Sequence, residues 1–197
     1  MTISAQGLTR VFDASAPPAV APAGVQGVLG YIGRAGKTPH VWTLEEWQPF
    51  AALRQFPCWV PDLSADPAGE AAAAAGAMTS LGWSRDLPAA STRALVADLE
   101  TAGGNAVAAW WARFSDAVHV NGFVAVAYGS LSTVLTVAAS WVWAADWDGQ
   151  ATLGEGQTVV GHQDAANVAF AGTRVDYSVI SPWLALRGGS GPRHAVR

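Results

Sequence analysis

The chain has 197 residues, which is enough for one domain with a sizeable core, whereas two domains would be cramped. Apolar residues make up 51% of it and charged residues 13%, a balance that excludes an intrinsically disordered chain. The net charge of −4 is modest and the sequence has no basic patch, which excludes the usual signature of a nucleic-acid-binding protein.

The N-terminal residues predict neither export nor membrane insertion. Residues 1–10 lack the charged region and long apolar region of a secretory signal, so we expect no signal peptide and synthesis in the cytoplasm. No apolar run approaches the roughly 20 residues that cross a bilayer, so no membrane partner is expected. Cys58 is the only cysteine, which excludes an intramolecular disulfide.

Short apolar runs alternate with longer amphipathic stretches, a pattern typical of βα units. Eight strands are expected, at about Leu8–Ala14, Val25–Ile32, Cys58–Asp62, Ala94–Glu100, Phe123–Tyr128, Ala139–Ala144, Thr158–Gln163 and Arg174–Ile180. Eight strands favour a closed barrel. A regular eightfold βα barrel takes about 250 residues, so this shorter chain must lack some helices.

Helix signals are concentrated in the first two thirds of the chain. Thr43 and Glu46 form a capping box, and Asp66-Pro67 supplies an N-cap followed by proline at the first helical position. Helices are expected at about 43–55, 66–82, 105–118 and 130–137, with loops at 145–157 and 164–173. The sequence therefore predicts an α/β fold, an incomplete TIM-like barrel of five βα units followed by three strands with short or missing helices. It would span residues 1–186, before a flexible Gly-rich tail at 187–197.

Two acids, Asp98 and Glu100, end the fourth expected strand. Alternate side chains of a strand share a face, so both carboxyls would point the same way, with Cβ atoms roughly 6–7 Å apart. Glycoside hydrolysis uses two carboxyl groups about 5–10 Å apart. Two acids are also common at a solvated strand end, so this pair by itself leaves both interpretations open.

Two further acids can reach the same end of the barrel. Asp13 closes the first expected strand, whereas Asp176 lies near the start of the last one. Asp176 would join the others only if its strand runs antiparallel, which a short connection requires. Carboxylates crowded in a cleft raise one another's pKa, so one of them can stay protonated near neutral pH and donate a proton.

No cofactor and no metal are expected. The four histidines show no ligand spacing and no cysteine pair exists; they are His40, His119, His162 and His194. Tyr31 and Tyr128 end strands, where each is either a cleft residue or a rim residue that satisfies its own hydroxyl.

Several short motifs follow one another in the order seen in a glycosidase family. They are Asp13 with Ser15, Asp98-Leu99-Glu100, Ala127-Tyr128-Gly129-Ser130, Trp141–Trp147, His162-Gln163 and Val175-Asp176-Tyr177. This series resembles the family-25 glycoside hydrolases, which are cell-wall muramidases with a barrel of five βα units and three further strands. Residues 30–46 look more like a related glycoside-hydrolase-like domain of unknown function from actinobacterial and phage proteins. The resemblance covers about residues 8–183, although the chain lacks the glycine that usually precedes the first aspartate.

The resemblance implies a role for each acid. Glu100 would be the catalytic acid/base, and Asp98 would stabilise the substrate's acetamido group and the positive charge on the sugar ring. Asp13 and Asp176 would be the outer aspartates, Asp13 within the catalytic set and Asp176 in substrate binding. Substrate-binding roles are also implied for Tyr128, Tyr31, Trp143 and Gln163. The substrate would be peptidoglycan or another amino-sugar polymer.

A second interpretation belongs to a different class. The chain has no recognisable wall-binding module, so it could instead be a non-catalytic phage virion protein, structural or sugar-binding, that meets its neighbours through the termini. It would then act in a phage particle rather than as a glycosidase at the cell wall. The sequence leaves open whether the chain is an enzyme; an open acidic cleft would favour catalysis.

Overall fold

The computed structural model describes residues 7–34, 40–83, 93–100, 105–137, 139, 141–149 and 159–187. A closed barrel forms its centre, and the eight strands follow one another around it in chain order. They are β1 (Thr9–Asp13), β2 (Gly27–Arg34), β3 (Arg54–Val60), β4 (Ala94–Asp98), β5 (Val124–Ser130), β6 (Val142–Ala145), β7 (Val159–Phe170) and β8 (Thr173–Ile180). The predicted TIM-like α/β barrel is confirmed.

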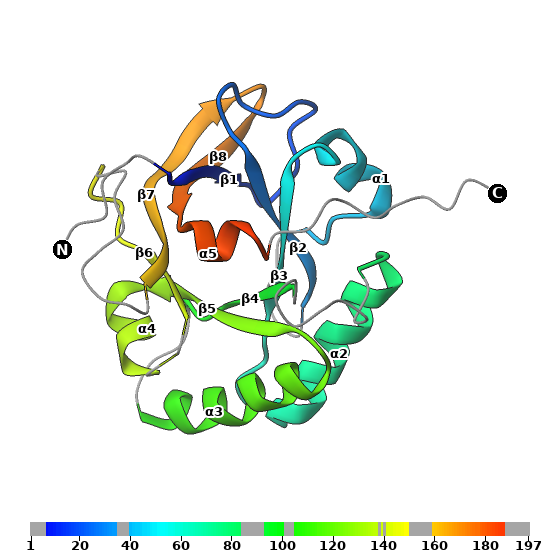
Figure 1. Ribbon diagram of the computed structural model, residues 1–197, viewed down its shortest axis with the longest axis vertical. Coiled ribbons are helices and arrows are strands. Elements are labelled where there is room, and N and C mark those ends of the chain that lie inside the picture. The colour runs from blue at the N-terminus through cyan, green and yellow to red at the C-terminus, as the bar shows by residue number, and fades with distance from the viewer. Residues whose placement is uncertain are drawn as a thin grey trace.

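Helices cover the outside of the barrel unevenly, with the long α2 and α3 side by side on one flank (Figure 1). The helices are α1 (Leu44–Trp47), the 3-10 turn η1 (Gln48–Phe50), α2 (Pro67–Ser80), α3 (Asn105–Val120), α4 (Leu131–Thr136) and α5 (Pro182–Ala185). None of the helices in these described residues is both long and apolar enough to cross a membrane.

Strand β8 runs against its neighbours. The strands from β1 to β7 pair in parallel, whereas β8 is antiparallel to both β1 and β7. In the β1–β8 ladder Asp13 lies directly opposite Asp176. Asp176 could join the other acids only if its strand ran antiparallel, and it does. The start of β8 therefore lies at the carboxyl end of the other strands.

Side chains alternate between the barrel interior and the helix-covered outside, as the two-residue period of a strand requires. On β1, for example, Val11 belongs to the interior cluster and Phe12 to the outer one. The short α5 adds Leu184 and Ala185 to the interior cluster, and Figure 1 shows it across the middle of the barrel.

Two hydrogen bonds anchor α5 at the amino-terminal end of the strands. The Arg54 guanidinium donates to the Ala185 carbonyl at 2.6 Å, and the Ala94 amide donates to the Arg187 carbonyl at 3.2 Å. Arg54 and Ala94 are the first residues of β3 and β4. Helix α5, which the sequence did not predict, thus closes the barrel at the end opposite to the acids.

Two helix predictions near the N-terminus need correction. The helix expected over 43–55 ends at Trp47, because Pro49 has no N–H to continue it, and the chain passes through η1 into a strand that begins at Arg54. Residues 14–26, between β1 and β2, contain no helix, so the first of the five expected βα units lacks one. Three prolines in that stretch, at positions 17, 18 and 22, remove backbone donors that a helix would need.

The loop expected between Gln163 and Arg174 is instead a β-hairpin. Strand β7 continues to Phe170, and β8 begins only three residues later at Thr173. The turn uses Ala171 and Gly172, both with positive φ (+44° and +82°). Positive φ matches the backbone twist of a two-residue hairpin turn, for which glycine is the usual sequence signal.

Gly33 allows β2 to pack against Trp59, and its replacement tests this contact. A Cβ at position 33 would overlap the Trp59 ring, whose indole N–H is fixed by a 2.9 Å bond to the Glu70 carboxylate. We expect Gly33→Ala to lower the free energy of unfolding by about 1–3 kcal/mol in urea denaturation. The control is Gly76→Ala in α2, where a Cβ meets nothing within 4 Å and should add about 0.5–1 kcal/mol. Equal midpoints for Gly33→Ala and the native chain would contradict the packing argument.

Candidate active site

Four carboxylates meet at the carboxyl end of the parallel strands. Asp13 and Asp98 are the last residues of β1 and β4, each two positions beyond an interior valine, so both continue the inward-facing row. Asp176 joins Asp13 through the antiparallel ladder, and Glu100 follows Asp98 by two residues. The carboxylates of Asp176, Glu100 and Asp98 all act on Asp13 and raise its pKa, which shows that the four lie close together.

The side chain of Gln163 links this cluster from β7. Its amide nitrogen donates to Asp13 Oδ2 at 3.3 Å and to Asp176 Oδ2 at 2.9 Å. Its carbonyl oxygen accepts from the Tyr128 hydroxyl at 3.0 Å and the Trp147 indole N–H at 2.6 Å. A flipped amide would turn its N–H groups toward two donors, so these four bonds fix one orientation.

Gln163, which was predicted to bind substrate, is fully buried beside the outer aspartates. Its side chain has no exposed surface, and both of its amide hydrogens and both carbonyl lone pairs are directed at protein groups. In the structure Gln163 therefore holds the two outer aspartates together, and its binding of substrate stays a prediction.

Asp98 is held in place while Glu100 is open to solvent. Asp98 Oδ1 accepts the Glu100 backbone N–H at 3.0 Å, and the Tyr31 hydroxyl donates to Asp98 Oδ2 at 3.5 Å. Asp98 is half-buried, whereas Glu100, just beyond the strand, is exposed. A ligand arriving from solvent can reach the Glu100 carboxyl beside a fixed Asp98.

Burial raises the pKa of every acid in the cluster, and repulsion by neighbouring acids adds to it for Asp13 and Glu100. Burial is the largest cause for Asp13, and the charge of Asp176 adds to it. Burial also raises the pKa of Asp98 and Asp176, against hydrogen bonds that favour their charged forms. The pKa of Glu100 rises because its carboxyl is partly removed from water and lies near Asp98, while a hydrogen bond with Tyr128 lowers it. The cluster thus keeps protons to higher pH than isolated carboxyls do.

Two tryptophans near the cluster differ sharply in exposure. Trp143 was predicted to bind substrate, but it has no exposed surface and its indole N–H donates to Ser178 Oγ at 3.0 Å inside the barrel. The structure thus places Trp143 in the barrel core, and its contact with substrate stays a prediction. Trp147, which the sequence did not single out, is 59% exposed and reaches the cluster through its bond to Gln163. The sequence signal that could have identified Trp147 as a site residue is its position just after the end of β6.

The tyrosines and one histidine also have defined places. Tyr31 and Tyr128 both direct their hydroxyls at the cluster, and Tyr128 is almost fully buried. The expectation of no metal rested on spacing between histidines. In the structure His162 instead lies against two carboxylates, of Asp146 and Asp148, close enough together to hold a metal ion.

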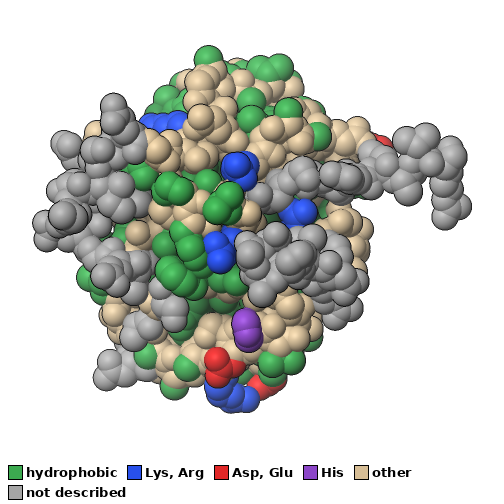
Figure 2. Space-filling model, viewed as in Figure 1, with side chains coloured by type: hydrophobic (Ala, Val, Ile, Leu, Met, Phe, Trp, Pro, Cys, Tyr) green, Lys and Arg blue, Asp and Glu red, His purple; other side chains and the backbone are tan. Residues whose placement is uncertain are grey.

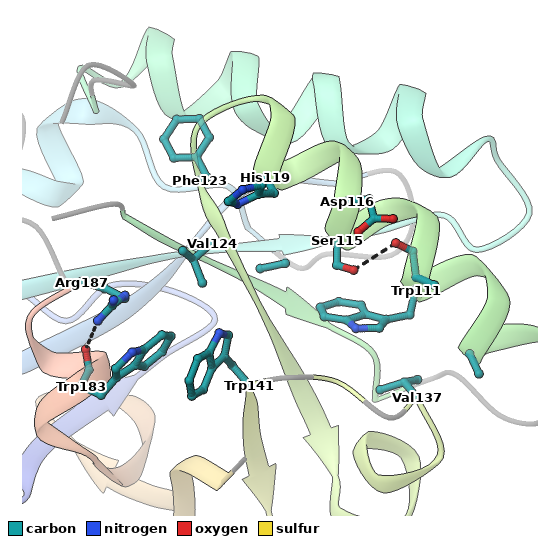
Figure 3. A pocket seen from close by; sticks show the side chains of 13 residues that line it. Trp111, Ser115, Asp116, His119, Phe123, Val124, Val137, Trp141, Trp183 and Arg187 are labelled. Carbon is teal, nitrogen blue, oxygen red and sulfur yellow. Dashed lines mark hydrogen bonds between the residues drawn. The ribbon is translucent and has the colours of Figure 1, made fainter. Parts of the chain in front are cut away.

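A cavity of about 580 Å³ lies between α3, the start of β5 and α5, and none of the four clustered acids lines it. Figure 3 shows Trp141 and Trp183 side by side in it, stacked with ring centroids 3.8 Å apart. The Arg187 guanidinium lies 3.9 Å from the Trp183 ring centroid. On the face drawn in Figure 2, apolar side chains gather near the centre. None of the predicted site residues lines this cavity.

Comparison with solved structures identifies the fold. No protein-family profile and no curated protein sequence matches the chain. A muramidase from Acremonium alcalophilum superposes with a TM-score of 0.64 at 16% identity, over 92% of this chain and 99% of that one. A family 25 glycosyl hydrolase from Bacillus anthracis gives 0.62 at 8% identity, over 87% and 88% of the two chains. This chain has the family-25 muramidase fold.

Two further structures with this fold are a bacterial lysozyme and an endolysin. The bacterial lysozyme from Streptomyces coelicolor gives a TM-score of 0.63 at 16% identity, over 91% of this chain and 96% of that one. The CTP1L endolysin gives 0.64 at 15% identity and covers 89% of this chain, which spans 67% of the endolysin. At these identities the comparisons establish the muramidase-type barrel, while the chemistry has to be argued from the residues.

The raised pKa of Asp13 predicts that its charge destabilises the fold. A carboxyl with a raised pKa binds its proton more tightly in the folded chain, so stability is highest below the unfolded pKa and falls as pH rises through the folded value. Asp13→Asn keeps an acceptor for Gln163 and removes the charge. We expect it to add about 1 kcal/mol to the free energy of unfolding at pH 8, a gain that shrinks toward pH 4.

Urea denaturation at the two pH values measures this gain. The exposed Asp116→Asn on α3 is the control, and its effect should be small at both. A native chain that is more stable than Asp13→Asn at pH 8 would show that the Asp13 charge is compensated.

Proposed function

We propose that this chain is a muramidase-like glycoside hydrolase acting on peptidoglycan or another amino-sugar polymer. The observation that supports it most is the exposed Glu100 carboxyl with a raised pKa beside the fixed Asp98, at the carboxyl end of a family-25-type barrel. A carboxyl with a raised pKa, next to a second acid in a different environment, is the arrangement that separates acid from base roles.

In this proposal Glu100 protonates the glycosidic oxygen as the bond from that oxygen to the anomeric carbon breaks. The sugar ring then carries positive charge, which the Asp98 carboxylate stabilises directly or through the acetamido group. Water adds to the anomeric carbon and returns its proton to Glu100, which restores the starting state. The backbone N–H that Asp98 accepts from Glu100 keeps the two carboxyls in fixed relation through these steps.

The outer aspartates would shape the field around this pair. Gln163 holds Asp13 and Asp176, and their negative charges favour the cationic sugar ring over the neutral substrate. Trp147 would offer the flat face of its exposed indole to a sugar ring at the edge of the site. Tyr31, directed at Asp98, would hold that carboxylate in its orientation.

Glu100→Gln tests the acid role directly. The amide cannot donate a catalytic proton, so we expect the release of reducing ends from purified peptidoglycan to fall by at least about 100-fold. Glu45→Gln, which changes an exposed carboxyl on α1, is the matched control and should keep native activity. Equal activity of Glu100→Gln and the native chain would refute the assignment. Peptidoglycan binding without cleavage by the native chain would favour the non-catalytic virion protein instead.

Tyr128→Phe tests the electrostatic part of the proposal. The Tyr128 hydrogen bond lowers the pKa of Glu100, so its loss should raise that pKa and keep Glu100 protonated to higher pH. We expect the alkaline limb of the pH–rate profile to move to higher pH. Tyr177→Phe is the control, since the Tyr177 ring packs against Arg10, and it should leave the limb in place. An unmoved limb in Tyr128→Phe would show that Glu100 does not set it.

A further inference from the structure

Three side chains of metal-ligating type meet beside the acid cluster without belonging to it. Asp146 and Asp148 lie in the segment after β6, and His162 lies in β7. One ligand atom from each of the three lies within 4.8 Å of the other two. His162 Nε2 and Asp148 Oδ1 lie 3.6 Å apart.

The spacing of these atoms suits a shared cation. Imidazole nitrogen and carboxylate oxygen bind Zn²⁺ at about 2.0–2.2 Å, so two ligands of one ion lie roughly 3–4 Å apart. The 3.6 Å separation falls inside that range and is longer than a good hydrogen bond. The two groups already form an ion pair across this distance, and the same distance is compatible with two ligands of one ion.

Strand pairing and backbone hydrogen bonds bring the two aspartates to the histidine. The β6–β7 ladder sets Ala144 opposite His162. Beyond it, the amides of Asp146 and Trp147 both donate to the Gln163 carbonyl, and the Gly149 amide donates to the Asp164 carbonyl. The segment is thus tied to β7 on both sides of Asp148.

Burial gives the group an inner and an outer side. His162 is 5% exposed, whereas Asp146 and Asp148 are exposed. An ion held here would take the imidazole nitrogen from inside and the carboxylates from the rim, with its remaining positions facing water. The two carboxylates together carry the charge that balances a divalent cation.

We propose that Asp146, Asp148 and His162 form a binding site for a divalent transition-metal ion of the Zn²⁺ class. The imidazole ligand disfavours Mg²⁺ and Ca²⁺, which prefer all-oxygen sites, and the absence of thiolate from the group disfavours Cu(I). The site does not depend on the proposed glycosidase activity. It bears on the candidate active site because Trp147 lies between the two aspartates and donates to Gln163, so an ion here would stiffen that exposed indole.

The test is a Zn²⁺ titration of the full chain, untagged and freed of metal with a chelator, by isothermal calorimetry. We expect one ion per chain and a chelator-reversible rise in melting temperature. Asp146→Asn and Asp148→Asn, both at exposed positions and expected to fold, should each weaken Zn²⁺ binding by at least about tenfold. His162→Gln should do the same. Co²⁺ added in place of Zn²⁺ should give an absorption spectrum of the bound ion that Asp148→Asn alters.

Asp116→Asn and His119→Gln on α3 are the matched controls, an exposed aspartate and histidine one helical turn apart. Both should leave Zn²⁺ affinity unchanged. The proposal is overturned by the absence of saturable binding, by affinity that survives both aspartate variants, or by a loss of affinity in the α3 controls as large as in the site variants. Because the readouts are binding, melting and absorption, they succeed or fail independently of any glycosidase activity.

Discussion

The direction of β8 determines which acids can meet at one end of the barrel. Seven strands run parallel and gather their carboxyl ends on one side of the barrel. Strand β8 enters from that side through the β7–β8 hairpin, so its early residues, rather than its late ones, reach the acids. Asp176 stands opposite Asp13 for this reason. A parallel β8 would carry Asp176 to the other end of the barrel, and the cluster would lose one of its four carboxylates.

Like charges held this close need a rigid support, and Gln163 provides it. A neutral amide with two donors can satisfy two carboxylates at once without cancelling their charge. A lysine or arginine in its place would pair with them and lower their pKa values. The neighbouring Tyr128 and Trp147 fix the amide from its other side. Holding these acids close together lowers the stability of the fold and concentrates negative electrostatic potential at one place, as functional sites often do.

Local patterns predicted the strands and the acids because both depend on a two-residue period and on position at a strand end. The same reasoning did not consider that Trp143 lies within β6 on the inward-facing row and is therefore a core residue. It also passed over Trp147, because alternation says nothing about a side chain beyond the end of a strand. The hairpin was missed since its pairing depends on β8, which lies in the following segment, and Ala171 at positive φ gives no glycine signal. Helix α5 depends on contacts with β3 and β4, far away in sequence.

The pairing of β1 with β8 also bears on how the chain acquires its structure during synthesis. A ribosome releases β1 first and β8 last, so the ladder between residues 9–13 and 176–180 cannot form until almost the whole barrel has been made. Until then β1 has an open edge that could pair with another nascent chain. Contacts this distant in sequence slow folding, because the chain must close a long loop before they form. Barrel closure, and with it the meeting of Asp13 and Asp176, consequently has to wait until β8 has been synthesised.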